Sequence, residues 1–288
     1  MNLNLTRIGA IHRRIERCRR ARQPAKMSAK RNVLDKKQMI TVTNFTKRYK
    51  GFTAVKDLSF SVEPGQILGL LGPNGAGKTT TLRTLCGIIP PSSGSLSVAG
   101  HDVVQAPIAA KANLGYIPDD PRLFDTMTVW EHLAFTAASY KLADFEKDAE
   151  ALLASFELSH KRNTVVHNLS RGMRQKVAIA CAFLHNPKVI LFDEPLTGLD
   201  PQGIRRIQQA IRERAQAGAS IIISSHLLSL FENLCTHIMV LNLGECRRFG
   251  TMEDLLSEVG TTDSTSALEE VYFSITQASD ETSDKAAV

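Results

Sequence analysis

With 288 residues, 43% hydrophobic and 22% charged, the chain has the composition of a globular protein of one large domain or two small ones. Its longest apolar run, 177–184, is far shorter than the about 20 residues of a membrane-spanning helix, so we expect that it does not cross a bilayer. The net charge of +6 is local: residues 1–38 hold 12 of the 35 basic side chains and 2 of the 29 acidic ones, which leaves the remainder at −4. The charge therefore gives no support for a nucleic-acid-binding surface on the folded part.

The first 38 residues differ from the rest. Apolar residues at 5, 8, 11 and 15 recur at helical spacing among arginines, which is compatible with a basic amphipathic helix that contacts anionic lipid or directs the chain to an organelle. The reading we favour is a disordered leader, or sequence upstream of a true start at Met27 or Met39. The five cysteines are widely spaced and form no C-x-x-C pair, which favours reduced thiols over disulfides or zinc.

Regular periodicity begins at Met39. We expect strands at 40–45, 58–62, 67–71, 95–98, 113–117, 189–192 and 220–224, a hairpin around 242–244, and helices at 78–86, within 128–158, at 170–184, at 201–217 and from about 227. Thr128 and Glu131 fit a capping box, and Pro201 and Gly218 mark the two ends of one helix. Strands that alternate with helices predict an α/β fold with a parallel sheet and helices on both faces.

A glycine-rich loop follows the apolar strand 67–71 and precedes the helix at 78–86. It fits G-x-x-x-x-G-K-[ST], and its residues are Gly72, Pro73, Asn74, Gly75, Ala76, Gly77, Lys78 and Thr79, with Thr80 next in line. Between a strand and a helix, this pattern predicts a phosphate-binding loop whose backbone N–H groups surround the phosphates. Lys78 would reach the β- and γ-phosphates, and the Thr79 hydroxyl would bind Mg²⁺.

A pair of carboxylates ends the apolar strand at 189–192. In a phosphate-loop protein the first of them, Asp193, commonly holds Mg²⁺. The second, Glu194, is placed to accept a proton from an attacking water. The two sites together predict a nucleoside triphosphatase.

The run Leu169-Ser170-Arg171-Gly172-Met173, at the start of a helix, resembles the L-S-G-G-x signature of the ATP-binding subunits of ATP-binding-cassette (ABC) transporters. Other family motifs follow in the family's order: Tyr49 is similar to the aromatic residue that stacks on adenine, Asp200 lies in a loop like the one that lines the dimer interface, and His226 is similar to the switch histidine. The resemblance covers about residues 39–276.

The resemblance implies a P-loop NTPase core, an N-terminal antiparallel β subdomain and an inserted helical signature subdomain at about 118–172, with a polar disordered tail at 277–288. It also implies a homodimer or pseudo-dimer in which the signature, through Ser170 and Gly172, contacts the γ-phosphate of ATP on the opposite subunit. Arg171, Met173 and Asp200 then join the nucleotide-contacting residues. Lys78, Glu194 and His226 are the expected catalytic residues.

Two positions depart from the commonest family pattern. Arg171 replaces the first signature glycine, and Asp119 stands where the family usually has a glutamine that lies near Mg²⁺ and responds to the membrane subunit. An acid shortens the reach and adds charge, but Asp119 remains in the expected nucleotide and metal site. Asp119, the residues around Arg171 and the segment 267–273 all look like the bacterial exporter branch.

We therefore expect an ATP- and Mg²⁺-dependent subunit that powers export through a separate multi-span permease, peripheral to the cytoplasmic face of the membrane, with no nucleic acid partner. The alternatives are an importer-type ABC ATPase, or a regulatory ABC-type ATPase acting on ribosomes or DNA. The regulator is disfavoured because such proteins usually carry tandem cassettes or long insertions, and a phosphate-loop GTPase is disfavoured because no N-K-x-D motif is present.

Overall fold

A computed structural model describes residues 38–225, 231 and 234–254, all of which belong to one compact unit spanning 37–288. The leader, His226, most of the helix expected from about 227, the segment 267–273 and the tail lie outside the described residues. The boundaries expected for the leader, the helical subdomain and the tail stay predictions.

The structure contains two sheets. The first is antiparallel, in the order β2-β1-β4-β5, and its strands are β1 (Ile40–Tyr49), β2 (Phe52–Val62), β4 (Ser93–Val98) and β5 (His101–Asp102). This sheet is the antiparallel subdomain that the sequence predicts. Its strands β4 and β5 come after the glycine-rich loop in the sequence, so the subdomain is not built from the N-terminal segment alone.

The second sheet has the order β10-β9-β3-β8-β7-β6. Its strands are β3 (Ile67–Leu71), β6 (Leu114–Ile117), β7 (Val189–Asp193), β8 (Ser220–Ser225), β9 (His237–Asn242) and β10 (Glu245–Thr251). All neighbours are parallel except the β9–β10 hairpin, which confirms the parallel core and adds an antiparallel edge strand.

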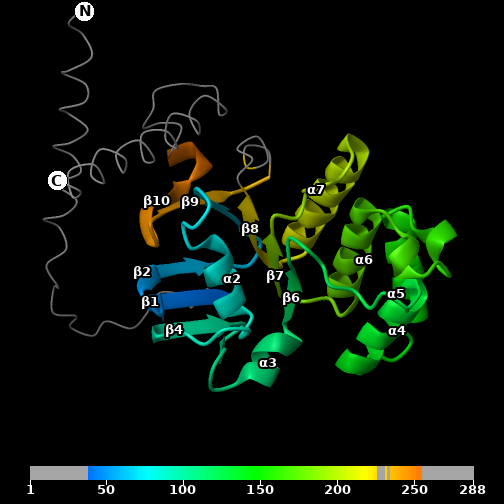
Figure 1. The fold of residues 1–288 in the computed structure, drawn as a ribbon, viewed down its shortest axis with the longest axis horizontal. Helices are drawn as coiled ribbons and strands as arrows, with labels where there is room; N and C mark the ends of the chain where they lie inside the picture. Colours follow the sequence, from blue (N-terminus) through cyan, green and yellow to red (C-terminus); the bar gives the residue numbers. More distant parts are fainter. Residues whose placement is uncertain (1–37, 226–230, 232–233, 255–288) are drawn as a thin grey trace, which may run out of the picture. The chain divides into compact units, whose positions relative to one another are not determined.

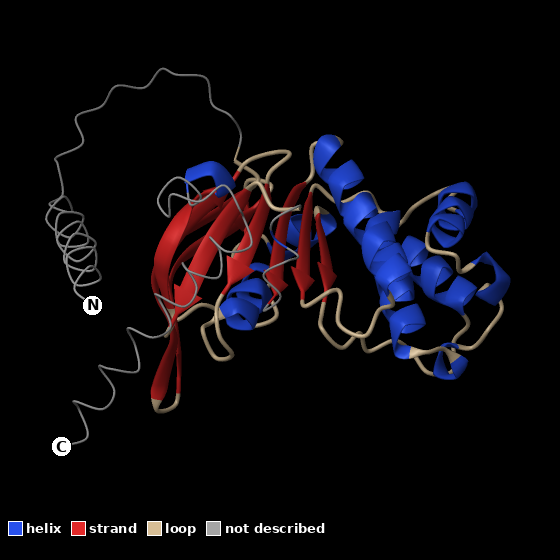
Figure 2. Ribbon diagram, turned by 90° about the horizontal axis from the view of Figure 1, so that it is seen from above, coloured by secondary structure: helices blue, strands red, loops and turns tan. Residues whose placement is uncertain are grey.

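Helices cover both faces of this second sheet (Figures 1 and 2). They are α2 (Lys78–Leu85), α3 (Pro107–Ala112), α4 (Val129–Tyr140), α5 (Glu146–Ser155), α6 (Arg171–Leu184) and α7 (Pro201–Gln216), with two 3₁₀ turns at Ser159–Lys161 and Val166–Asn168. In Figure 1, α4, α5 and α6 lie together in green, and α2 lies against the first sheet in blue and cyan.

Alternate residues of the central strands enter two separate cores. Ile67 and Leu71 of β3 face the core made with helices α4 to α7, whereas Leu68 and Leu70 face the core made with α2, α3 and the first sheet. Because both faces are buried, these strands read as continuous apolar runs. The loops that follow them therefore start from fixed positions, which matters because the predicted site residues lie on those loops.

The helix predictions that fall on described residues are confirmed with one refinement, and the helix expected from about 227 stays a prediction. The helical stretch 128–158 is two helices, because Lys141 takes a left-handed conformation (φ 55°) that ends α4. The Thr128–Glu131 capping box is present as predicted. Helix α3 and strand β5 were not predicted, because they are too short to show a periodicity.

Candidate nucleotide-binding site

The glycine-rich loop connects β3 to α2 and leaves no room for side chains at two of its glycines. A Cβ on Gly72 would collide with the carbonyl oxygen of Leu241 in β9, and one on Gly77 would lie 2.8 Å from the carbonyl oxygen of Ala54 in β2. Gly77 also has φ 103°, a conformation that favours glycine. Asn74 and Gly75 lie exposed at the loop tip. The backbone at the loop's two ends is thus held against both sheets while its tip faces solvent.

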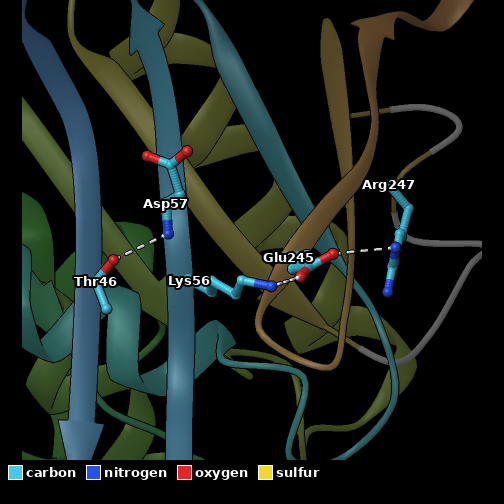
Figure 3. Close-up of polar contacts among 5 residues, drawn as sticks. All are labelled: Thr46, Lys56, Asp57, Glu245 and Arg247. Atoms are coloured by element: carbon cyan, nitrogen blue, oxygen red, sulfur yellow. Dashed lines mark hydrogen bonds and ion pairs between the residues drawn. The ribbon is translucent and has the colours of Figure 1, made fainter. Parts of the chain in front are cut away.

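The β9–β10 hairpin supports the loop from behind. The N–H of Gly244 donates to the carbonyl of Ala76 (3.2 Å), and the Gly244 carbonyl accepts from the N–H of Lys56 in β2 (2.8 Å). Figure 3 shows the adjacent ion pairs, in which the Glu245 carboxylate binds the Lys56 ammonium (2.9 Å) and the Arg247 guanidinium (3.1 Å). One glycine therefore joins the phosphate loop to the antiparallel sheet.

Lys78 supplies a buried positive charge at the loop. Its Nζ donates to the carbonyls of Gly72 (2.6 Å) and Pro73 (3.1 Å), and the residue is only 6% exposed. Burial lowers the pKa of Lys78 below its usual value, while the negative charges of Glu194 and Asp193 act in the opposite direction. A desolvated ammonium beside the N-terminus of α2 is an environment that favours a bound anion.

The Asp193 carboxylate collects hydrogen bonds from three elements. Its Oδ1 accepts from the hydroxyls of Thr79 at 3.0 Å and Ser224 at 2.7 Å, and its Oδ2 lies 3.5 Å from the Tyr116 hydroxyl. Burial, and secondarily the Asp193 charge, raise the pKa of Tyr116 to about 12, so this phenol stays protonated and donates. Thr79 and Asp193, two of the three predicted metal ligands, thus meet through their oxygen atoms, the ligand type that Mg²⁺ prefers, whereas the third, Asp119, contacts Arg171.

Glu194 follows at the sharp turn after β7. Its φ is 51°, an uncommon conformation for a residue with a side chain, and its N–H donates to the carbonyl of Ser224 (3.1 Å). Backbone strain of this kind clusters at functional sites. The Glu194 charge also acts on the Lys78 ammonium, so the carboxylate lies within electrostatic reach of the loop.

The signature residues form a second group at the N-terminus of α6. Ser170 is the N-cap, and its Oγ accepts from the N–H of Met173 (3.2 Å). A Cβ on Gly172 would lie 3.1 Å from the carbonyl oxygen of Gly198, so the loop after β7 packs closely here. Asp200, farther along that loop, caps α7 by accepting from the N–H of Gly203 (3.2 Å).

Asp119 joins this second group through Arg171. The Arg171 Nη2 and the Asp119 Oδ1 are 3.4 Å apart. The structure therefore brings the two departures from the family pattern into contact with each other.

Tyr49 lies at the end of β1, where a two-residue turn leads into β2. Its ring stacks on that of Phe52 with centroids 5.6 Å apart and planes inclined by 23°, and the two residues are 41% and 61% exposed. The Lys47 ammonium lies 5.1 Å from the Tyr49 ring centroid. An exposed aromatic pair suits stacking on a planar base.

The sequence patterns did not indicate a role in the site for Ser224, Tyr116, Gly244 or Phe52. Ser224 had no local signal, because its place opposite Asp193 depends on the parallel pairing of β7 with β8. Phe52 had a usable signal, because a two-residue turn after Tyr49 places the next aromatic residue directly opposite. Thr80 lies half-buried in the first turn of α2, as expected, and His226 lies outside the described residues.

The fold and the glycine-rich loop define a P-loop nucleotide-binding protein. A family model described as "ABC transporter" matches residues 55–197. The ABC-type transporter ATP-binding protein EcsA of Bacillus subtilis is 36% identical over 241 residues, which cover 83% of this chain and 97% of EcsA. The lipopolysaccharide export system ATP-binding protein LptB of Escherichia coli is 33% identical over 224 residues, covering 76% and 93% of the two chains.

A solved structure described as the ATP-binding subunit of an ABC transporter superposes with a TM-score of 0.77 at 32% identity, covering 81% of this chain and 99% of that one. The chain therefore belongs to the family of ABC transporter ATP-binding proteins, as the signature resemblance indicates. Among the residues that the structure describes, no helix combines the length and apolar content needed to cross a bilayer.

Proposed function

We propose that this chain binds and hydrolyses ATP and thereby powers export through a separate membrane-spanning permease. The observation that carries the proposal is the contact between the Thr79 hydroxyl and the Asp193 carboxylate (3.0 Å) at the N-terminus of the helix that follows the glycine-rich loop. These oxygens suit Mg²⁺, and the adjacent Lys78 ammonium suits a phosphate. A magnesium ion held by Thr79 and Asp193 would neutralise charge on the β- and γ-phosphate oxygens.

The other predicted site residues are proposed to have separate roles in ATP hydrolysis. Lys78 would exchange its contacts with the loop carbonyls for phosphate oxygens, which costs it little desolvation because it is already buried. Glu194 would accept the proton of the attacking water as general base. His226 is proposed to orient that water, and Tyr49 to stack on the adenine. The loop N–H groups, from Asn74 to Thr80, would surround the phosphates.

Two copies of the chain are proposed to close head to tail around ATP. The N-terminus of α6 carries partial positive charge and presents the Ser170 hydroxyl and the Gly172 N–H, which suits the γ-phosphate bound by the other copy. Arg171, Met173 and Asp200 would line the same interface. ATP can drive this closure only because it binds the closed pair better than the open one.

A groove of about 270 Å³ supports a docking site for the permease. The loop that contains Asp119 lines it with Pro121 and Leu123, and Tyr140 of α4 and Cys181 of α6 line its other side. The resemblance links this loop to the membrane subunit, so a permease segment in the groove would act directly on it. Docking there would make the chain a peripheral protein of the cytoplasmic membrane face, and the word "export" in the name of LptB favours export as the direction.

The substitution Glu194→Gln tests the hydrolytic role. It removes the general base but keeps the shape of the side chain, so we expect turnover to fall about 10²–10⁴-fold while ATP binding survives. Light scattering should then detect a dimer at saturating Mg-ATP, whereas Lys78→Ala should bind ATP poorly and stay monomeric. A Glu194→Gln variant that hydrolyses ATP at the wild-type rate, or remains monomeric with ATP bound, would contradict the proposal.

A further inference from the structure

Arg171 and Asp119 meet although 52 residues separate them in the sequence. Arg171 is the first residue of α6, and Asp119 lies two residues beyond the end of β6. Their charged groups are 3.4 Å apart, and the two side chains are 51% and 53% exposed. A glycine at 171 would have no side chain to reach Asp119, and a glutamine at 119 would carry no charge to pair with Arg171.

The stem of Arg171 covers a second loop. A Cβ on Gly198, in the loop after β7, would lie 3.1 Å from the Arg171 Cδ and 3.3 Å from its Nε. Gly198 has φ 81° and lies two residues before Asp200, the cap of α7. The Arg171 side chain therefore spans from the loop after β6 to the loop after β7, and both loops carry predicted site residues.

We propose that Arg171 and Asp119 act as one unit that positions the N-terminus of α6 relative to these two loops. Arg171 is a positioning residue in this scheme, because it acts through the loops and through the helix end that would face the partner's nucleotide. The inference rests on the proposed function and deepens it, since it assigns a shared task to the two residues that depart from the family pattern. Exposed ion pairs contribute little free energy, so we expect loss of this pair to lower turnover by only about two- to fivefold.

A double-mutant cycle tests the pairing. Asp119→Asn removes one charge, and Arg171→Met removes the other while keeping an apolar stem over Gly198. We expect each variant to lower kcat for ATP by about two- to fivefold with KM changed less than about twofold, and the double variant to be no slower than the slower single variant. The reversed pair, Asp119→Arg with Arg171→Asp, should recover part of the lost rate.

The matched control is the ion pair of Arg206 and Glu157, whose charged atoms lie 2.6 Å apart with exposures of 36% and 46%. It joins α7 to the segment after α5, so Arg206→Met and Glu157→Gln should leave kcat unchanged. Losses that multiply in the Asp119–Arg171 double variant would overturn the inference. Unchanged or faster hydrolysis in either single variant would overturn it as well.

Hydrogen exchange separates this inference from the proposed function. If the wild-type chain does not hydrolyse ATP, the proposed function fails, but the pairing can still be measured in the protein without nucleotide. The amides of residues 119, 120, 122 and 123 should exchange faster in Arg171→Met and return toward wild-type rates in the reversed pair, because the ion pair restrains that loop. Identical exchange in wild type and Arg171→Met would refute the positioning role.

Discussion

Gly244 is the residue that joins the phosphate loop to the antiparallel sheet, so its replacement by alanine tests that connection. Its φ is 77°, and an added Cβ would lie 2.7 Å from the Ala54 carbonyl oxygen and 3.1 Å from the Val55 Cα. The left-handed backbone costs an alanine about 1–2 kcal/mol. Overpacking against backbone atoms that cannot rotate away costs about 1–3 kcal/mol more. We expect Gly244→Ala to lower the free energy of unfolding by about 2–5 kcal/mol.

Gly218 provides the matched control. It has φ 95°, and a Cβ there would meet nothing within 4 Å, so Gly218→Ala incurs the backbone cost alone. The difference between the two variants in urea unfolding therefore measures the contact at Gly244. Because the Gly244 N–H holds the Ala76 carbonyl, a shifted hairpin should also weaken ATP binding, and a loss of 1.4 kcal/mol corresponds to tenfold in Kd.

Calorimetric titration with Mg-ATP, at a temperature below the thermal unfolding midpoint of both variants, measures the effect on ATP binding. We expect Kd to rise about tenfold in Gly244→Ala and to stay near the wild-type value in Gly218→Ala. Equal losses of stability in the two variants would refute the argument from the close contact. Wild-type ATP affinity in Gly244→Ala would show that the hairpin does not position the loop.

Two further predictions concern the groove. Burial raises the pKa of the Cys181 thiol to about 11, so only about one part in a thousand of it is thiolate at pH 8. We therefore expect iodoacetamide to modify the exposed Cys246 far faster than Cys181. Equal modification rates of the two cysteines, measured by mass spectrometry, would contradict this expectation. Phe135 is 52% exposed, and its ring packs on that of Phe124, the residue after the groove-lining Leu123. Phe135→Glu should reduce recovery of the chain with the proposed permease at least about tenfold, because a charge replaces apolar contact area. The control is Phe249→Glu, because Phe249 lies on β10, at the opposite edge of the sheet from β6. The Phe249→Glu chain should copurify with the permease as the wild type does. Equal recovery of the two variants would contradict docking of the permease in the groove.

The sequence was sufficient for the parts of the site that are contiguous in the chain. The strand, the glycine-rich loop and the helix are neighbours, and the carboxylates of Asp193 and Glu194 directly end an apolar run, so local patterns predicted each of them. The Ser170 and Asp200 caps were similarly readable as helix starts. The two-core arrangement also follows from continuous apolar strands.

The partners of these residues were not readable, because they depend on the order of strands in the sheet. Tyr116 and Ser224 reach Asp193 only because β6 and β8 lie on either side of β7 in the sheet. In the sequence, one α-helix separates β7 from β8, and three α-helices separate β6 from β7. The contact of Arg171 with Asp119 likewise arises from the packing of α6 near the end of β6. The sequence shows that Arg171 and Asp119 differ from the family pattern, but it does not show that the two side chains are in contact.

The hydrogen bonds around Asp193 bear on whether the subunit needs a metal ion in order to fold. Hydroxyl groups from β8 and α2 already donate hydrogen bonds to this buried carboxylate, so we expect the chain to fold without a divalent cation. Chelators should therefore leave its thermal stability intact, unlike that of a domain organised around a structural zinc ion. A magnesium ion held by Thr79 and Asp193, as proposed, would then bind as a local event, for which the Thr79 hydroxyl would turn its proton away from the aspartate and offer a lone pair.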